Sequence, residues 1–249
     1  MAEPIPAEVE RPAFYALASG GWRDYWTLLH PPYTAWHLSY VVMGAAIAPR
    51  FDGGRLGASV VGFFLGVGIC AHALDELRGR PLRTRISDGV LWTLAAVALA
   101  VAVGLGILGA IEVSWWLLAF VGFGAFIVVA YNLELFNGAF HGDLWFAAAW
   151  GAFPALTGYF AQAASVRVGA VLVAAACFAL SVAQRTLSTP VRRLRRSAAT
   201  VRVEIRYRDG STDRLDEAAL RGVPETVLRI LAVAVSLLAL GLVAARLLQ

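Results

Sequence analysis

Seven long apolar stretches occupy most of this chain and limit what it can fold into more than any other feature. About 20 predominantly apolar residues form a helix long enough to cross a lipid bilayer. The stretches lie at about 33–49, 56–74, 90–110, 113–132, 144–163, 168–187 and 225–247. Polar or charged turns separate them. The pattern predicts an all-α fold: a polytopic membrane helical bundle with about seven transmembrane helices.

The composition agrees with a membrane location. Apolar residues make up 59% of the chain and charged residues 15%, whereas soluble domains are roughly half apolar and about a quarter charged. Every basic residue is an arginine, and the arginines cluster between the apolar stretches. We therefore expect membrane lipids rather than nucleic acid as their partners. Cys70 and Cys177 lie inside apolar stretches and are expected to be buried free thiols.

The arginines are shared unequally between the two sides of such a bundle. The N-terminus and the loops after the even-numbered stretches carry most of them, including Arg192, Arg193, Arg195 and Arg196. The other side carries only Arg50, Arg55 and Arg167, with Arg246 at the far tail. Cytoplasmic loops of membrane proteins are enriched in basic residues. We therefore expect an integral, multi-pass protein of the inner cell membrane with a cytoplasmic N-terminus.

The one long hydrophilic segment contains a strand pattern. Apolar and charged residues alternate from 201 to 208, and Asp209–Gly210, a typical hairpin turn, follows. We expect a small cytoplasmic β-hairpin insertion and then a short helix at about 215–221. The expected organisation is a cytoplasmic tail and interfacial segment at 1–32, a transmembrane core at 33–190, a cytoplasmic loop at 191–224 and a last transmembrane helix at 225–249.

The first group of candidate site residues ends the second apolar stretch. Ionisable residues at membrane depth are costly, so each needs a reason. At about 100° per residue, His72, Asp75 and Glu76 share one face of a helix. A histidine with two carboxylates is a suitable ligand set for a divalent cation. The alternative is a helix end at which the two carboxylates meet head groups and Arg78.

The second group follows the fourth apolar stretch and contains Tyr131, Asn132, Glu134, His141 and Asp143. Tyr131 and Glu134 are neighbours if the helix continues through both. The His141–Asp143 spacing suits a loop chelate rather than one helix face. The alternative is a turn, with Asp143 as the N-cap of the next helix.

The third group ends the sixth apolar stretch. Its members are Gln184, Arg185, Ser188, Thr189, Pro190, Arg192 and Arg193. Guanidinium groups bind phosphate oxygens bidentately, so these arginines suit a phosphate or pyrophosphate group. Arg78, Arg80, Arg83 and Arg85 have the same property. The alternative for all of them is that they only anchor the helices at the membrane surface. His30 and His37 are expected to be hydrogen-bonded histidines at the interface.

Three segments resemble the UbiA-type intramembrane prenyltransferase superfamily. Residues 29–32, leading into a stretch that ends at 44–49, are similar to the first helix of the family. The Asp75 end of the second stretch, followed by 80–87, resembles the first aspartate motif and the P-x-R-x-I stretch after it. Residues 131–136 resemble the tyrosine-containing end of the fourth helix. The resemblance covers roughly residues 25–190.

The resemblance implies a UbiA-like helical ring around a cavity that opens to the cytoplasm. Family members bind an isoprenyl diphosphate through Mg²⁺ and two aspartate-rich motifs, and they transfer the prenyl group to an acceptor. This chain has Ala71-His72 where the family has Asn-Asp, and Gln184, Ser188 and Thr189 where the second motif is expected. About seven stretches replace the usual nine spans.

We therefore expect a divergent UbiA-like membrane enzyme that transfers an isoprenoid group from a lipid diphosphate. The expected catalytic residues are Asp75, Glu76 and Glu134. The expected metal ligands are His72, Asp75, Glu76, Glu134, His141 and Asp143. The expected substrate-binding residues are Arg78, Arg83, Tyr131, Asn132, Gln184 and Arg193.

Two alternatives stay open at this point. The mixed histidine and carboxylate set suits Fe or Mn better than Mg²⁺ alone, which would fit a metal-dependent oxidoreductase or hydrolase acting on a lipid. The protein is otherwise a non-catalytic lipid-binding protein or a membrane partner subunit. A polar path through the apolar stretches is not visible, which argues against a channel.

Overall fold

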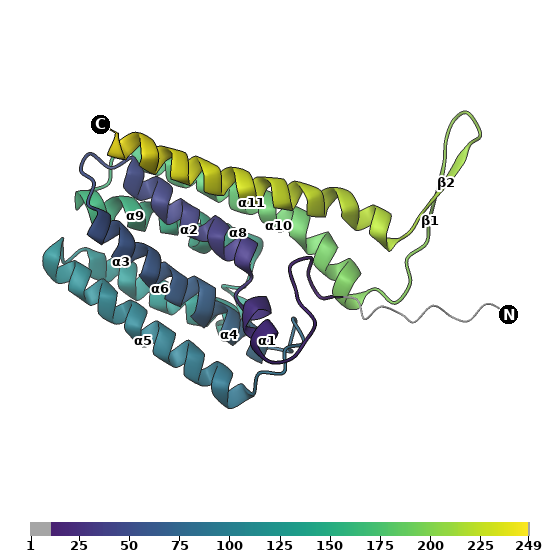
Figure 1. Ribbon diagram of the computed structural model, residues 1–249, viewed down its shortest axis with the longest axis horizontal. Coiled ribbons are helices and arrows are strands. Elements are labelled where there is room, and N and C mark those ends of the chain that lie inside the picture. The colour runs from purple at the N-terminus through teal and green to yellow at the C-terminus, as the bar shows by residue number, and fades with distance from the viewer. Residues whose placement is uncertain (1–10, 249) are drawn as a thin grey trace.

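The computed structural model describes residues 11–248, which form a bundle of long helices lying side by side (Figure 1). The helices are α1 (Trp22–Leu28), α2 (Pro31–Ala46), α3 (Gly53–Phe63), η1 (Phe64–Ala71), α4 (His72–Leu77), α5 (Asp88–Glu112), α6 (Leu117–Asn132), α7 (Leu135–Gly138), α8 (Asp143–Ala147), η2 (Ala148–Ala152), α9 (Phe153–Ala163), α10 (Val168–Ser197) and α11 (Glu217–Leu247). Strands β1 (Val203–Arg206) and β2 (Thr212–Leu215) complete the described part. Segments η1 and η2 are π-helical turns within longer helices.

Within residues 11–248, four helical segments are long and apolar enough to cross a membrane. They are Gly53–Leu77, Asp88–Glu112, Val168–Ser197 and Glu217–Leu247. The stretches predicted at 33–49, 113–132 and 144–163 coincide with helices that are shorter or less apolar. These helices support a mostly helical membrane protein.

Helix α2 lies in the interior of the bundle, in contact with α9 and α11. Small residues allow this close approach. A Cβ atom at Gly44 would overlap the carbonyl oxygen of Ala155, and one at Gly158 would overlap that of Val41. Close approach through small residues is the usual packing of membrane helices, because lipid tails provide no hydrophobic drive for association.

Two main groups of buried side chains hold the helices together. One surrounds Trp36, Tyr40 and Leu228 and joins α2, α9, α10 and α11. The other joins η1, α4, α5 and α6, with Leu74 and Leu91 among its members. Cys70 and Cys177 are buried free thiols, one in each group, as expected from the sequence.

Helices α10 and α11 extend beyond the stretches predicted at 168–187 and 225–247. The short helix expected at 215–221 is not separate: it is the first part of α11. The Arg195 Nη2 atom donates to Glu225 Oε2 at 2.9 Å, and both side chains are largely buried. This ion pair links the extended end of α10 to α11.

The predicted β-hairpin is confirmed. Strands β1 and β2 pair antiparallel, with Val203 opposite Leu215 and Arg206 opposite Thr212. Gly210 has a φ of 88°, the left-handed conformation that the turn requires. The Asp209 carboxylate accepts hydrogen bonds from the amide and the hydroxyl of Ser211, which lower its pKa. The hairpin projects from the ends of α10 and α11, away from the bundle (Figure 1).

Candidate functional site

Ionisable and aromatic side chains from five segments meet at the end of the bundle that carries the N-terminal segment. We call them the polar cluster. Its members are Tyr15, His30, Tyr33, His72, Asp75, Tyr131, His141, Arg192 and Arg196. They come from the segment before α1, the start of α2, α4, the end of α6 with its following loop, and α10. The polar cluster therefore depends on the whole tertiary fold.

Backbone carbonyl groups orient His72 and His141, the two histidines of the polar cluster that the sequence predicted as metal ligands. His72 Nδ1 donates to the Gly68 carbonyl oxygen at 3.1 Å, and His141 Nδ1 donates to the Tyr131 carbonyl oxygen at 2.9 Å. Each Nε2 atom keeps its lone pair in this tautomer. Such an atom can accept a proton or bind a metal ion.

His30 lies against His72, with ring centroids 4.1 Å apart. The sequence predicted a hydrogen-bonded His30, but its Nε2 atom is buried and has no hydrogen-bond partner among the described residues. Burial, followed by the neighbouring His72, lowers the pKa of His30 well below its ordinary value. His30 is therefore a neutral imidazole at pH 7. His37 does meet the expectation, because its Nδ1 donates to the Trp150 carbonyl oxygen at 2.8 Å.

Asp75 is the one predicted carboxylate in the described residues that lies in the polar cluster. Asp75 is partly buried, and within residues 11–248 its side chain makes neither a hydrogen bond nor an ion pair. Its carboxylate is within electrostatic range of Arg196, Arg192 and His141. A carboxylate without a fixed partner is available to take a proton or to bind a ligand.

Glu76, the adjacent residue, has a different environment. Its side chain is fully buried. Its carboxylate oxygens accept hydrogen bonds from the Leu82 amide, the Thr84 amide and the Thr84 hydroxyl, each at 2.9 Å. Glu76 therefore fixes the 78–86 loop to the end of α4. The structure favours this role over ligand binding.

Glu134 and Asp143 lie on the surface rather than in the polar cluster. Helix α6 ends at Asn132, and Glu134 has a φ of 52°, so Tyr131 and Glu134 are not neighbours on one helix face. The Glu134 carboxylate pairs with Arg78 at 2.8 Å. Asp143 follows the N-cap Gly142 and pairs with Arg185 at 2.7 Å.

These surroundings test the metal set that the family resemblance implies. Of six predicted ligands, three carboxylates are engaged elsewhere: Glu76 by the loop, Glu134 and Asp143 by arginines. Across residues 11–248 no three His, Cys, Asp or Glu side chains gather closely enough to hold a metal ion. The residues present do not fit a divalent metal held by two acidic clusters. The metal stays a prediction.

The predicted substrate-binding residues divide into two sets. Tyr131 and Gln184 are buried, and the Tyr131 hydroxyl and Gln184 Oε1 have no hydrogen-bond partner in the described chain. Asn132 Nδ2 donates to the Val128 carbonyl within its own helix. The three arginines of the prediction, Arg78, Arg83 and Arg193, are on the surface or in surface contacts.

Of the arginines in the polar cluster, the sequence named Arg192 in the third candidate group but chose Arg193 as the expected substrate-binding residue, and it did not single out Arg196 as a site residue. Arg192 precedes Arg193 by one position and therefore faces another direction. On α10 it follows Ser181, Gln184 and Ser188, which are all buried, at the three- and four-residue spacing of one helix face. This spacing was visible in the sequence and could have distinguished Arg192 from Arg193.

The segment 11–20, which we call the N-terminal strap, covers the polar cluster. Arg195 Nη1 donates to the Arg11 carbonyl at 3.2 Å, and Arg196 Nε donates to the Pro12 carbonyl at 3.3 Å. The Tyr15 ring packs on His30, with centroids 5.3 Å apart. Burial, and then the nearby Tyr33, raise the pKa of Tyr15. Its phenol therefore stays protonated and can donate a hydrogen bond.

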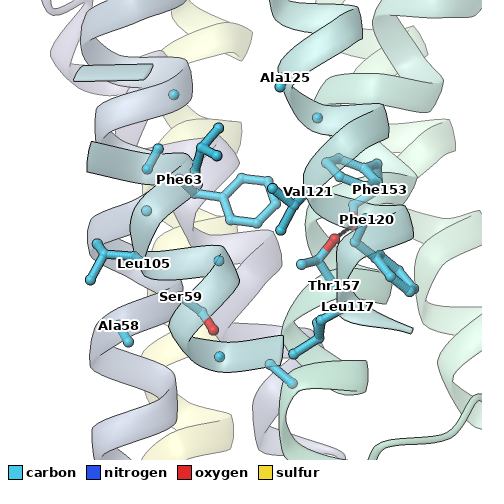
Figure 2. Close-up of a pocket in the computed structure, with 18 of the residues that line it drawn as sticks. Ala58, Ser59, Phe63, Leu105, Leu117, Phe120, Val121, Ala125, Phe153 and Thr157 are labelled. Atoms are coloured by element: carbon cyan, nitrogen blue, oxygen red, sulfur yellow. Dashed lines mark hydrogen bonds between the residues drawn. The ribbon is translucent and has the colours of Figure 1, made fainter. Parts of the chain in front are cut away.

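An apolar cavity of about 540 Å³ lies among α3, α5, α6 and α9, a volume within the usual range for small-molecule sites. Figure 2 shows Phe63 and Val121 extending into this space from two helices, with Phe153 beside them. Its polar lining includes Asp52, Arg55 and Glu112 at the end away from the polar cluster, and most of the remaining lining is apolar. Such a cavity suits a hydrocarbon chain.

The inner end of the apolar cavity lies next to the polar cluster. Val67 and Trp150 line the cavity. Val67 precedes Gly68, the residue that orients His72, and the Trp150 ring lies 4.5 Å from that of Tyr131. At about 1.5 Å rise per residue, His72 is less than two helical turns from Val67. The cavity and the polar cluster are therefore in contact through Trp150 and Tyr131, although no member of the polar cluster lines the cavity itself.

Comparisons with known proteins add no relative. No protein-family model, no curated protein and no solved structure matches this chain.

Proposed function

We propose that this chain is a seven-span membrane transferase that moves a prenyl group from a lipid diphosphate, with its site facing the cytoplasm. The observation that carries the proposal is the apolar cavity that ends beside the polar cluster. An isoprenoid diphosphate has the matching shape: a hydrocarbon tail and an anionic head. The polar cluster lies at the end of the bundle that carries the N-terminal strap and the arginine-rich loops. Because cytoplasmic loops are enriched in basic residues, we infer that the site faces the cytoplasm.

The polar cluster contains groups suited to each part of such a transfer. The carbon–oxygen bond of the prenyl ester breaks, and the diphosphate leaves with the bonding electron pair. Arg192 and Arg196 stabilise the negative charge of the leaving group. The ring of Tyr131, which packs at a tilt against Trp150, faces the developing positive charge on carbon. The acceptor loses a proton to Asp75 or to a free histidine Nε2 atom as the new bond forms.

A transfer assay tests this reaction. Purified protein in lipid nanodiscs would receive radiolabelled farnesyl diphosphate and a total lipid extract as acceptor source. We expect diphosphate release and label in a new lipid product. Asp75→Asn should lose most of this activity, since removal of a catalytic acid or base typically costs about 10²–10⁴-fold. The matched control Asp88→Asn, at an exposed carboxylate on the same side, should keep it.

Full transfer by Asp75→Asn, or no transfer by the wild-type protein, would contradict the proposal. In the second case we favour a non-catalytic protein that binds a phosphate-headed lipid. Its supporting observation is that Glu76, Glu134 and Asp143 are all engaged by other protein groups. That candidate predicts saturable binding of farnesyl diphosphate without turnover. The oxidoreductase and hydrolase alternatives stay predictions, because nothing in the geometry adds to them.

A further inference from the structure

Arg192 is charged and partly buried, and the part of the chain that the structure describes provides no acidic partner for it. Its Nη1 atom donates to the Ser188 hydroxyl and its Nη2 atom to the Thr189 hydroxyl, each at 3.1 Å. Throughout residues 11–248 no carboxylate lies within 4.0 Å of its guanidinium group. Arg185 and Arg196 add positive charge nearby. Burial of a charge among like charges is costly unless an anion balances it.

Arg196 resembles Arg192 because its side chain also has a neutral hydrogen-bond partner instead of a carboxylate in the described residues. Its Nε atom donates to the Pro12 carbonyl of the N-terminal strap, which is a neutral partner. Several neighbouring arginines differ, since Arg78, Arg185 and Arg195 each pair with a carboxylate. Arg192 and Arg196 therefore keep their charge available at the polar cluster.

The surroundings of these two arginines also favour an anion. Asp75 is one negative charge against two guanidinium groups, so the polar cluster keeps positive charge in excess. His30 is neutral, and Tyr15 carries a protonated hydroxyl within electrostatic range of both arginines. The Tyr131 hydroxyl is buried and without a partner in the described chain. Phenols and guanidinium groups together supply donors for several oxygens of one ligand.

We propose that Arg192 and Arg196 bind a phosphate or diphosphate oxyanion directly, without a bridging divalent cation. The site rests on the proposed function in so far as the anion is the head of a lipid whose tail lies in the apolar cavity. Arginine forks provide the bidentate contacts that a metal would otherwise supply. The group would replace the neutral Pro12 carbonyl as the partner of Arg196. A site without a metal needs no carboxylate ligands, which agrees with the engagement of Glu76, Glu134 and Asp143 by other protein groups.

Binding in the presence of excess EDTA tests the site. Full-length protein in nanodiscs would be titrated with radiolabelled farnesyl diphosphate, with inorganic pyrophosphate as competitor. The wild-type protein should bind with EDTA present. Arg192→Gln should weaken binding about tenfold or more, because charge-assisted hydrogen bonds are lost. Arg192→Lys should restore part of the affinity, since it keeps the charge without the fork.

Arg193→Gln is the matched control. Arg193 is exposed, carries the same charge and lies one residue away, so its substitution should change affinity less than about twofold. Weak competition by pyrophosphate identifies a lipid head group as the anion, and full competition identifies free phosphate chemistry. Thermal unfolding of each variant shows that it is folded.

The inference is overturned if wild-type binding disappears with EDTA, or if Arg192→Gln and Arg193→Gln bind equally well. Its failure is distinguishable from failure of the proposed reaction. Binding with EDTA but no prenyl transfer contradicts only the transferase. If the protein transfers the prenyl group but binds farnesyl diphosphate only when Mg²⁺ is present, only the direct anion site is contradicted.

Discussion

Asp75 and Glu76 are adjacent in the chain but have opposite environments. Asp75 has no fixed partner in the described residues and faces two arginines, whereas Glu76 is enclosed by the 78–86 loop. A sequence shows that both carboxylates end one helix. It does not show that a loop six to eight residues later turns back and donates three hydrogen bonds to only one of them.

Glu76→Gln tests the structural role of this carboxylate. One amide nitrogen replaces an acceptor oxygen, so at least one buried donor of Leu82 or Thr84 loses its partner. The expected loss of stability is about 1–3 kcal/mol, measured by thermal unfolding in detergent. Glu134→Gln removes an exposed ion pair and should cost about 0–1 kcal/mol. Equal destabilisation by the two substitutions would refute the distinction.

Because His30 is buried, we expect the free energy of unfolding to depend on pH. The pKa of His30 is lowered by burial in the folded state, so below about pH 6.5 the unfolded chain binds a proton that the folded chain does not. The stability contributed by neutral His30 is complete above that pH and decreases as the pH falls. The limiting slope for one proton is about 1.4 kcal/mol per pH unit.

Unfolding temperatures between pH 7.5 and pH 5, a window placed around the ordinary histidine pKa of about 6.5, check this slope. We expect His30→Asn to lose part of the acid sensitivity of the wild-type protein. The same pH profile in both proteins would show that His30 is not held neutral.

At the scale of elements, sequence patterns with a short period predicted the strands and the main helices well. The alternation at 201–208 with Asp209–Gly210 predicted the hairpin, and apolar stretches located the main helices. Helix ends were less predictable. Helices α10 and α11 both continue into polar sequence, and the buried ion pair between Arg195 and Glu225 links them there. Helix α6 ends at Asn132, where the apolar stretch also ends, and the left-handed Glu134 keeps the helix from continuing through Tyr131 and Glu134. Both depend on contacts that a local pattern does not contain.

The packing of α2 on α9 makes a prediction about glycine. Gly44→Ala or Gly158→Ala would place a Cβ atom on the backbone of the opposite helix. The helices would have to separate, at a cost of at least about 1–3 kcal/mol. The control Gly57→Ala meets no atom within 4 Å and should stabilise α3 by up to about 1 kcal/mol. Unfolding temperature and the yield of monodisperse protein measure both effects, and an unchanged Gly44→Ala protein would contradict this packing.

At the scale of the whole molecule, the polar cluster joins residues that are more than 170 positions apart, Tyr15 and Arg196 among them. The sequence identified His72, Asp75 and His141 as candidates, because charge at membrane depth is unusual. It named Arg192 in the third candidate group but not among the expected substrate-binding residues. It did not identify Tyr15, Tyr33 or Arg196 as site residues, because aromatic residues and arginines near helix ends are common at membrane interfaces. Their convergence follows only from the tertiary fold.

The proposed orientation can be measured with two single-cysteine substitutions. Ser211→Cys lies in the exposed hairpin, and Val166→Cys lies in the exposed turn before α10. An impermeant maleimide should label Ser211→Cys from the cytoplasmic side and Val166→Cys from the opposite side. The background should be low, since Cys70 and Cys177 are buried. Labelling of both from one side would contradict the seven-span proposal.

The central claim is that a lipid places its head in the polar cluster and its tail in the apolar cavity. Photo-crosslinking measures this most directly, using farnesyl diphosphate with a diazirine at the tail end and mass spectrometry of the labelled peptides. We predict labelling of the cavity lining, at Phe63, Leu105 or Val121, and its loss when unlabelled farnesyl diphosphate competes. Labelling confined to the outward face of α11, at Leu237 and Leu240, would contradict the account.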